Sequence, residues 1–202
     1  MKTNKKKLTL TTIVLAAIAV TVFVNMKLHD VAQKGNILEA EVLLKQNYGD
    51  GVNDVDKHGD TPLHLAIANN KLSMVKYLLE NHAQVTKQNN EGVTPLYEAA
   101  AAGNNDVIKL LLDRSNAQET INLKNGKKEG GFYTPLHVAI MRGHPATVEL
   151  LLSRGANPAI KTADEKTAYE IAEEWFEESK GSSHHEKQKK IVELLRNYKN
   201  KK

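Results

Sequence analysis

Apolar positions in this chain fall into pairs of short stripes that are separated by polar turns. In each of three central units, a first stripe is followed by a small-residue turn such as Ala102-Gly103-Asn104, which suits a left-handed helix end. The second stripes then span 74–79, 107–112 and 148–152. Stripes of this length predict short helices with one buried side. Each unit is therefore expected to contain two short helices.

A Thr-Pro step begins each central unit. It stands at Thr61-Pro62, Thr94-Pro95 and Thr134-Pro135, and a degenerate form with Ala in place of Pro stands at Thr167-Ala168. The Thr hydroxyl can cap a helix N-terminus, and Pro suits the first helical position because its missing N–H would have no partner there. Successive starts are 33, 40 and 33 residues apart. A period in the thirties indicates stacked helical repeats rather than a single globular core.

The motif at these steps resembles the ankyrin repeat. Thr-Pro-Leu-His-x-Ala stands at 61–66 and at 134–139, and Arg-Gly-Ala-Asn-Pro completes one copy at 154–158. The resemblance covers about 28–199 and implies an all-α ankyrin-repeat solenoid of stacked helix-turn-helix units with β-hairpin-like loops. It also implies that the motif histidines hydrogen-bond the backbone of a neighbouring hairpin, whereas Tyr97 replaces His in one copy. The residues assigned to this structural motif are Thr61, Pro62, His64, Thr94, Pro95, Thr134, Pro135 and His137.

The repeat pattern divides the chain into an N-terminal segment, 1–27, and five repeats. Repeat 1 lacks the Thr-Pro step and is expected to be an N-terminal cap whose outer face tolerates water. Repeat 3 has an extended hairpin. The last repeat is expected to be a degenerate C-terminal cap with a basic tail, and its first helix should run through Trp175-Phe176. The repeats are predicted at 28–60, 61–93, 94–133, 134–166 and 167–202.

Residues 1–27 are expected to anchor or target the protein. Lys5-Lys6-Lys7 precedes an uncharged, apolar run of 17 residues at 8–24, close to the shortest length that spans a bilayer. Lysines before such a run stay on the cytoplasmic side, which predicts a single-pass membrane protein of the bacterial envelope with its C-terminal repeats exported. Ala17-Ile18-Ala19 keeps open the alternative of a cleaved signal peptide and a periplasmic or secreted protein.

Charge and composition exclude several function classes. Residues 1–27 hold five of the 28 basic residues, which leaves 23 basic against 24 acidic residues in the rest of the chain. Without a basic excess there, no nucleic-acid partner is expected. The chain has no Cys, His184-His185 has no third metal ligand at a suitable spacing, and no phosphate-binding or nucleophile motif occurs. We therefore expect no metal, no cofactor and no enzymatic activity.

The interval before the fourth repeat contains seven additional residues within 116–133. Asn125-Gly126 favours a hairpin turn there. Insertions in repeat proteins often lie on the binding face, so we consider this loop a candidate contact region. The alternative is that its aromatic residues pack against a neighbouring repeat while its lysines only solvate the loop. The candidate contact residues of the extension are Lys127, Lys128, Phe132 and Tyr133.

The pattern favours a protein-interaction module without catalytic activity. Solenoids bind their partners through a concave surface, which is made from hairpin tips and first helices. The alternative is a scaffold for envelope assembly whose role depends on its membrane anchor at 8–24. Alignment with the ankyrin pattern adds candidate partner-binding residues outside the extension, namely Lys57, His58, Asp60, Asn69, Asn90, Glu91, Met141 and Arg142.

Overall fold

The computed structural model describes residues 27–46, 51–114, 119–126 and 131–200. Over these ranges the chain forms ten helices and no strand, which confirms the all-α prediction. The predicted apolar run at 8–24 lies outside the described residues, and no helix within them is long and apolar enough to cross a membrane. The helices are α2 (Leu28–Lys34), α3 (Ile37–Gln46), α4 (Pro62–Ala68), α5 (Leu72–Glu80), α6 (Pro95–Ala102), α7 (Asn105–Leu112), α8 (Pro135–Met141), α9 (Pro145–Ser153), α10 (Ala168–Glu178) and α11 (His185–Asn200).

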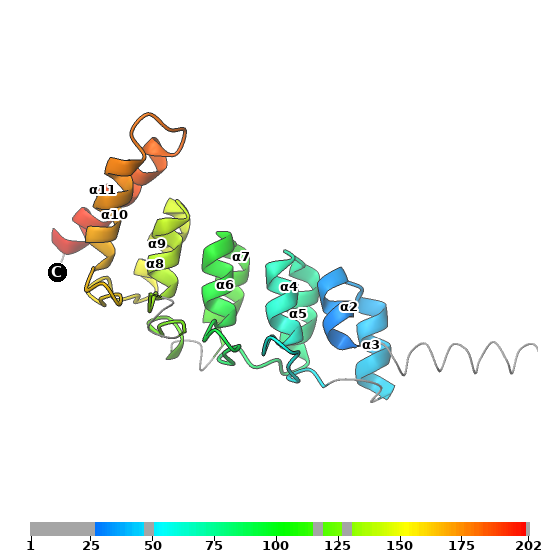
Figure 1. Cartoon of the computed structure of the whole chain (residues 1–202). Coiled ribbons are helices and arrows are strands. Elements are labelled where there is room, and N and C mark those ends of the chain that lie inside the picture. Colours follow the sequence, from blue (N-terminus) through cyan, green and yellow to red (C-terminus); the bar gives the residue numbers. More distant parts are fainter. Residues whose placement is uncertain (1–26, 47–50, 115–118, 127–130, 201–202) are drawn as a thin grey trace, which may run out of the picture.

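The helices stand as consecutive pairs in a row, and the loops that join one pair to the next project to one side (Figure 1). The first helices of the pairs contact one another in the order α2, α4, α6, α8 and α10. The second helices contact one another in the order α3, α5, α7, α9 and α11. The structure is therefore two layers of helices, in which each pair packs against its neighbours along the row.

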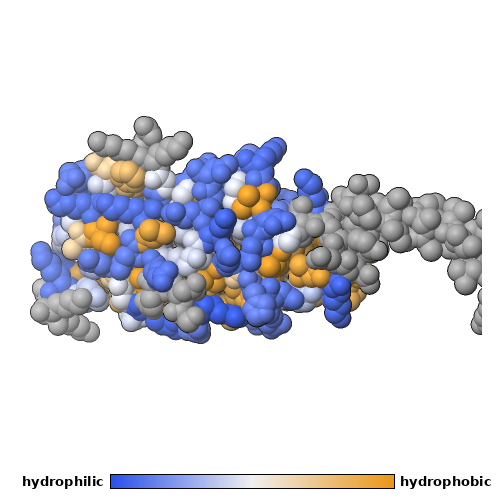
Figure 2. All heavy atoms as spheres, turned by 90° about the horizontal axis from the view of Figure 1, so that it is seen from below, coloured by the Kyte–Doolittle hydropathy of each residue, from blue (hydrophilic) through white to orange (hydrophobic). Residues whose placement is uncertain are grey.

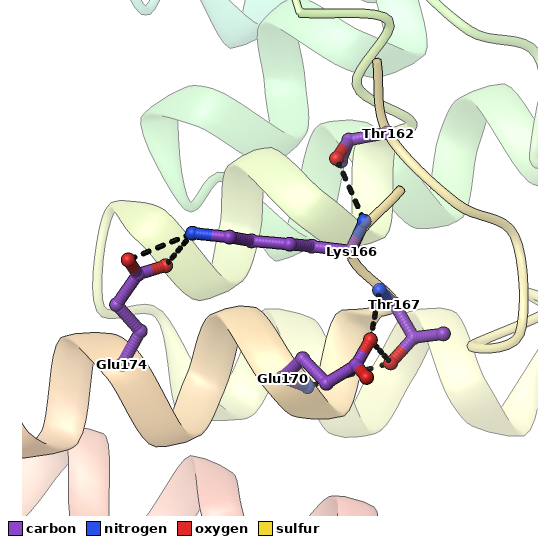
Figure 3. Close-up of polar contacts among 5 residues, drawn as sticks. All are labelled: Thr162, Lys166, Thr167, Glu170 and Glu174. Carbon is purple, nitrogen blue, oxygen red and sulfur yellow. Dashed lines mark hydrogen bonds and ion pairs between the residues drawn. The ribbon is translucent and has the colours of Figure 1, made fainter. Parts of the chain in front are cut away.

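The Thr residues that begin the repeats cap the first helices. The Thr61 hydroxyl accepts a hydrogen bond from the His64 backbone N–H, and the Thr61 backbone N–H donates to His64 Nδ1 over 3.2 Å. The same reciprocal box recurs at Thr134 and His137, and Glu170 takes the place of His in the box at Thr167 (Figure 3). These boxes satisfy backbone donors at the helix start, where no intrahelical partner exists.

A continuous apolar core runs between the two layers. The Leu that follows each Thr-Pro step, at 63, 96 and 136, is at most 1% exposed. Met74, Ile108 and Val148 of the second layer belong to the same buried cluster and are fully buried. Burying a side chain of this size stabilises the fold by about 1.5–3 kcal/mol, so the stacked core holds the array together.

The two ends of the array are formed by the first and the last helix pair. At the N-terminal end, Leu38 and Val42 lie one turn apart on α3 and remain 75% and 37% exposed. Repeat 1 therefore leaves two apolar side chains open to solvent, and its role as a water-tolerant cap stays a prediction. At the other end, α10 continues through Trp175-Phe176 as predicted, and the Phe176 ring stacks on His185 with ring centres 4.5 Å apart.

Candidate protein-binding face

The candidate site lies on the inner face, by which we mean α4, α6, α8 and α10 with the loops that precede them. Its first groove has a volume of about 360 Å³ and lies between the loops that precede α4 and α6. The structure brings four of the predicted contact residues together here. They are His58, Asp60, Asn90 and Glu91, and they line the groove with His64, Asn89, Glu98 and neighbouring apolar atoms. We call this the acidic groove.

Glu98 is the half-buried carboxylate of the acidic groove. Burial raises its pKa above the ordinary value, and the charge of nearby Asp60 raises it further. Arg142 acts in the opposite direction, because its guanidinium favours the ionised carboxylate. An ionised carboxylate in a partly desolvated groove gains from an additional cation, so this position favours a positively charged ligand group.

Several predicted contact residues also join neighbouring loops to one another. The Asn90 backbone N–H donates to the His58 carbonyl over 3.0 Å, and Asn90 Nδ2 donates to the Lys57 carbonyl over 3.1 Å. Asn69 Nδ2 donates to Leu65 within its own helix region over 2.9 Å. The Lys57 and His58 side chains remain exposed. Asn90 and Asn69 therefore already have intramolecular partners for part of their hydrogen-bonding capacity.

A second and larger groove, of about 640 Å³, lies between α6, α8 and the last helix pair. Predicted contact residues Tyr133, Met141 and Arg142 line it. Tyr97, Val138, Trp175, Glu178 and Gln188 complete its main surface. Tyr, Trp, Met and Arg are the residues that are enriched at protein interfaces, and Trp, Tyr and Arg dominate their energetic hot spots. We call this the aromatic groove.

The extended hairpin is closed at its base by two hydrogen bonds between Asn125 and Tyr133. The Asn125 backbone N–H donates to the Tyr133 carbonyl over 2.8 Å, and the Tyr133 N–H donates to Asn125 Oδ1 over 2.7 Å. Phe132 lies half-buried outside the aromatic groove, with Lys124 Nζ 5.8 Å from its ring centre. Lys127 and Lys128 lie outside the described residues. Of the four predicted residues of the extension, only Tyr133 is thus placed in a groove.

Nine of the twelve residues that line the aromatic groove were missing from the predicted site, and Tyr97, Trp175 and Gln188 matter most among them. Tyr97 stands where the motif has His, and its side chain lines the groove instead of closing a capping box. Trp175 was assigned to a cap, but it is 36% exposed and turned towards the same groove. Two signals could have identified Tyr97 and Trp175: Tyr97 departs from the motif, and Trp175 is the single Trp of the chain. Gln188 gave no such signal, because its position depends on how α11 packs.

The side chain of Gln188 is only 3% exposed, yet half of its amide has no partner. Its Nε2 donates to the Ile140 carbonyl over 3.2 Å. Its Oε1 accepts no hydrogen bond from any described residue. A buried acceptor without a donor costs about 1–3 kcal/mol, and this acceptor belongs to a residue that lines the aromatic groove.

The motif histidines have structural surroundings. His64 Nε2 lies 3.1 Å from the Val93 carbonyl, as the ankyrin resemblance implied. His137 differs, since its Nε2 has no hydrogen bond of acceptable geometry to a described residue. Burial lowers the pKa of His137 to about 4, and only a weaker contact with the Ile160 carbonyl opposes this. The implied hydrogen bond is therefore well formed at His64 and poorly aligned at His137, and both imidazoles favour the neutral form.

An ion pair fixes α10 beside the loop that precedes it. Lys166 Nζ donates to both carboxylate oxygens of Glu174 over 2.6–2.7 Å, and the Lys166 backbone N–H donates to the Thr162 hydroxyl (Figure 3). Glu174 immediately precedes Trp175, so this contact helps to orient the turn of α10 that carries the groove indole. Both partners are exposed to solvent, which screens their attraction, so the pair contributes little to stability.

The described residues contain no group of three or more metal-binding side chains. The geometry on the inner face consists of shallow grooves with polar edges and a few large apolar side chains. Figure 2, which views the side of the projecting loops, shows a mostly hydrophilic surface with small, separate hydrophobic patches. Such a surface suits recognition of another macromolecule by a few anchors.

Comparison with known proteins agrees with the paired helices, the capping boxes and the row of loops. A family model of ankyrin repeats in three copies matches residues 28–125 and, overlapping them, 82–162. The chain belongs to the ankyrin-repeat family. Ankyrin repeats generally mediate protein–protein interaction, and proteins of this kind are typically not enzymes.

Ankyrin-repeat relatives of this chain occur in several much longer proteins. The chain is 29% identical over 131 residues to human transient receptor potential cation channel subfamily A member 1, and 34% identical over 121 residues to the Caenorhabditis elegans homolog. It is 31% identical over 117 residues to the nuclear factor NF-kappa-B p105 subunit of Gallus gallus. These matches cover 65%, 60% and 58% of this chain but only 11%, 10% and 12% of the relatives. The chain therefore spans only about a tenth of the length of these relatives.

Proposed function

We propose that this protein is a non-enzymatic interaction module that binds a protein partner through the inner face of its ankyrin stack. The observation that carries this proposal is the aromatic groove, in which Tyr97, Tyr133, Met141, Arg142 and Trp175 from three successive repeats line one surface. Large side chains of these types bury much area per immobilised residue and supply most of the binding energy in protein interfaces.

We further propose that the module is exported and tethered to the membrane by its apolar run at 8–24. The sequence of that run and the lysines before it support this proposal. Exposed Leu38 and Val42 also support it, because they lie in the helix pair nearest to the run in sequence and would tolerate a membrane-proximal position. The alternative is a scaffold whose role in envelope assembly requires the anchor more than the grooves.

Variants of the groove test the binding function. Met141→Glu and Trp175→Ala in the full-length chain should abolish recovery of a partner that the unchanged chain captures by crosslinking, while Glu149→Lys on the exposed side of α9 should not. Equal recovery with all three variants would contradict binding through the inner face.

The intact mass of the mature protein tests the tether. A full-length mass in the membrane fraction is the expected result. A mass that lacks the first nineteen or more residues, found in the soluble exported fraction, would show that the segment is a cleaved signal and would contradict the tether.

A further inference from the structure

We propose that the partner segment bound by the inner face is an extended basic peptide that carries an apolar anchor residue. The anchor lies among Tyr97, Met141 and Trp175, and the basic side chains reach the carboxylates of the acidic groove. This inference rests on the proposed protein-binding function and adds the chemical class of the ligand.

The two grooves adjoin at α6 on the inner face. Tyr97 lines the aromatic groove and the next residue, Glu98, lines the acidic groove. The axes of neighbouring packed helices lie up to about 10 Å apart. Three such spacings separate α4 from α10, so the inner face between them is roughly 30 Å long. An extended peptide rises about 3.3 Å per residue, and nine or ten residues would therefore cover both grooves.

The charge of the two grooves favours a cationic ligand. Asp60, Glu91 and Glu98 line the acidic groove, and Glu178 lines the aromatic groove. Arg142 is the one Lys or Arg among the described residues that line either groove. None of the four carboxylates forms an ion pair with a described Lys or Arg. Lysine or arginine side chains of a partner would supply the missing counter-charges.

Gln188 supplies a second and independent reason to expect a peptide. Gln188 is buried and lines the aromatic groove, and its Oε1 accepts no hydrogen bond from the described residues. Gly143 also lines this groove and lies close to Gln188, because a Cβ added to it would stand 3.6 Å from Gln188 Nε2. The unpaired oxygen requires a donor, and a backbone N–H of an extended segment is such a group, whereas a carboxylate is not.

Trp175 provides a direct signal for occupancy, because it is the only Trp of the chain. We would select dodecapeptides from a random library on the full-length chain, which is held in phosphatidylcholine vesicles to accommodate its apolar run. Peptides synthesised without Trp are then titrated while the fluorescence of Trp175 is recorded. We expect selection of Lys and Arg around one Phe, Leu or Met, and a saturable fluorescence change.

Matched variants separate the charge proposal from binding itself. Glu98→Gln and Glu178→Gln should each weaken the selected peptide about fivefold, and Glu149→Gln on α9 should leave its affinity unchanged. Selection of neutral or acidic peptides that still change Trp175 fluorescence would overturn the basic-ligand proposal alone. The same conclusion would follow if the peptide affinity were unchanged in both groove variants. Failure to select any peptide that changes Trp175 fluorescence would overturn both this proposal and binding through the grooves.

Discussion

Gln188 and Ile140 lie 48 residues apart in sequence, yet Gln188 Nε2 donates to the Ile140 carbonyl over 3.2 Å. This bond joins α11 to the end of α8. The same carbonyl also accepts the Gly143 backbone N–H over 3.0 Å, so it does not depend on Gln188 for a partner. The amide of Gln188 is thus buried with its oxygen unpaired, while its nitrogen donates to a carbonyl that already has another donor.

Gln188→Met should separate stability from binding. The lost hydrogen bond is worth about 1 kcal/mol, but the variant also removes a buried acceptor without a partner, so we expect the free energy of unfolding to change by less than about 1 kcal/mol. The affinity for a groove ligand should fall about tenfold, because the acceptor for its N–H is lost. Urea unfolding and Trp175 titration measure the two effects. A large loss of stability with unchanged affinity would assign Gln188 a purely structural role.

Tyr97→His should have opposite effects on stability and on binding. Thr94 caps α6 by accepting the backbone N–H of Tyr97, but it lacks the reciprocal half of the box that His64 and His137 provide. Restoring the motif should raise the free energy of unfolding by about 0.5–1 kcal/mol. Removing the tyrosine ring from the aromatic groove should weaken partner binding. A variant that is less stable and binds equally well would contradict both expectations.

Stability should decrease in mild acid because of His137. Burial lowers its pKa in the folded chain to about 4, from an ordinary value of 6.5. Above pH 6.5 both the folded and unfolded chains are neutral at this residue, so it contributes no pH dependence there. Between about pH 6.5 and 4 the unfolded chain binds the proton and the folded chain does not, which costs up to about 3 kcal/mol.

The comparison of His137→Gln with the unchanged chain isolates this effect. The free energy of unfolding, measured by urea at pH 7 and pH 4.5, should fall less in the variant than in the unchanged chain. His64 is retained in both proteins, and its own pKa is lowered by burial, so its contribution cancels in the difference. Equal losses in the two proteins would show that His137 does not remain neutral in the folded state.

Gly92→Ala should destabilise the stack. Gly92 has φ +74°, and an added Cβ would lie 2.2 Å from the backbone nitrogen of Gly126 in the next loop. Gly181 has a similar φ of +82° but no atom within 4 Å of such a Cβ, which makes Gly181→Ala the matched control for backbone strain. We expect about 1 kcal/mol for the control and at least about 2 kcal/mol for Gly92→Ala in thermal or urea unfolding. Equal costs would contradict close packing of the two loops.

The repeat architecture was predictable because its signals are local. Thr-Pro steps cap helices through contacts three residues apart, and the stripes at 74–79 and 107–112 bury the same face in each repeat. The predicted all-α fold and the ankyrin repeats were confirmed for this reason. The exposure of Leu38 and Val42 was not predictable, because it depends on what covers the end of the array.

The site was predictable only in part. The motif places His58, Asp60 and Glu91 at loop tips, and these residues do line one groove. The aromatic groove depends instead on how the last helix pair packs against α8 and α9, which involves long-range contacts such as Gln188 to Ile140. Sequence spacing carries no information on such contacts, so Trp175 was assigned to a cap.

Site-specific photocrosslinking in living cells tests the central claim most directly. A photoreactive phenylalanine analogue would replace Met141 in the aromatic groove or, as a control, Glu149 on the exposed side of α9. The account predicts a discrete crosslinked protein from position 141 and none from position 149. A partner that crosslinks equally from both positions, or only from position 149, would contradict binding through the inner face.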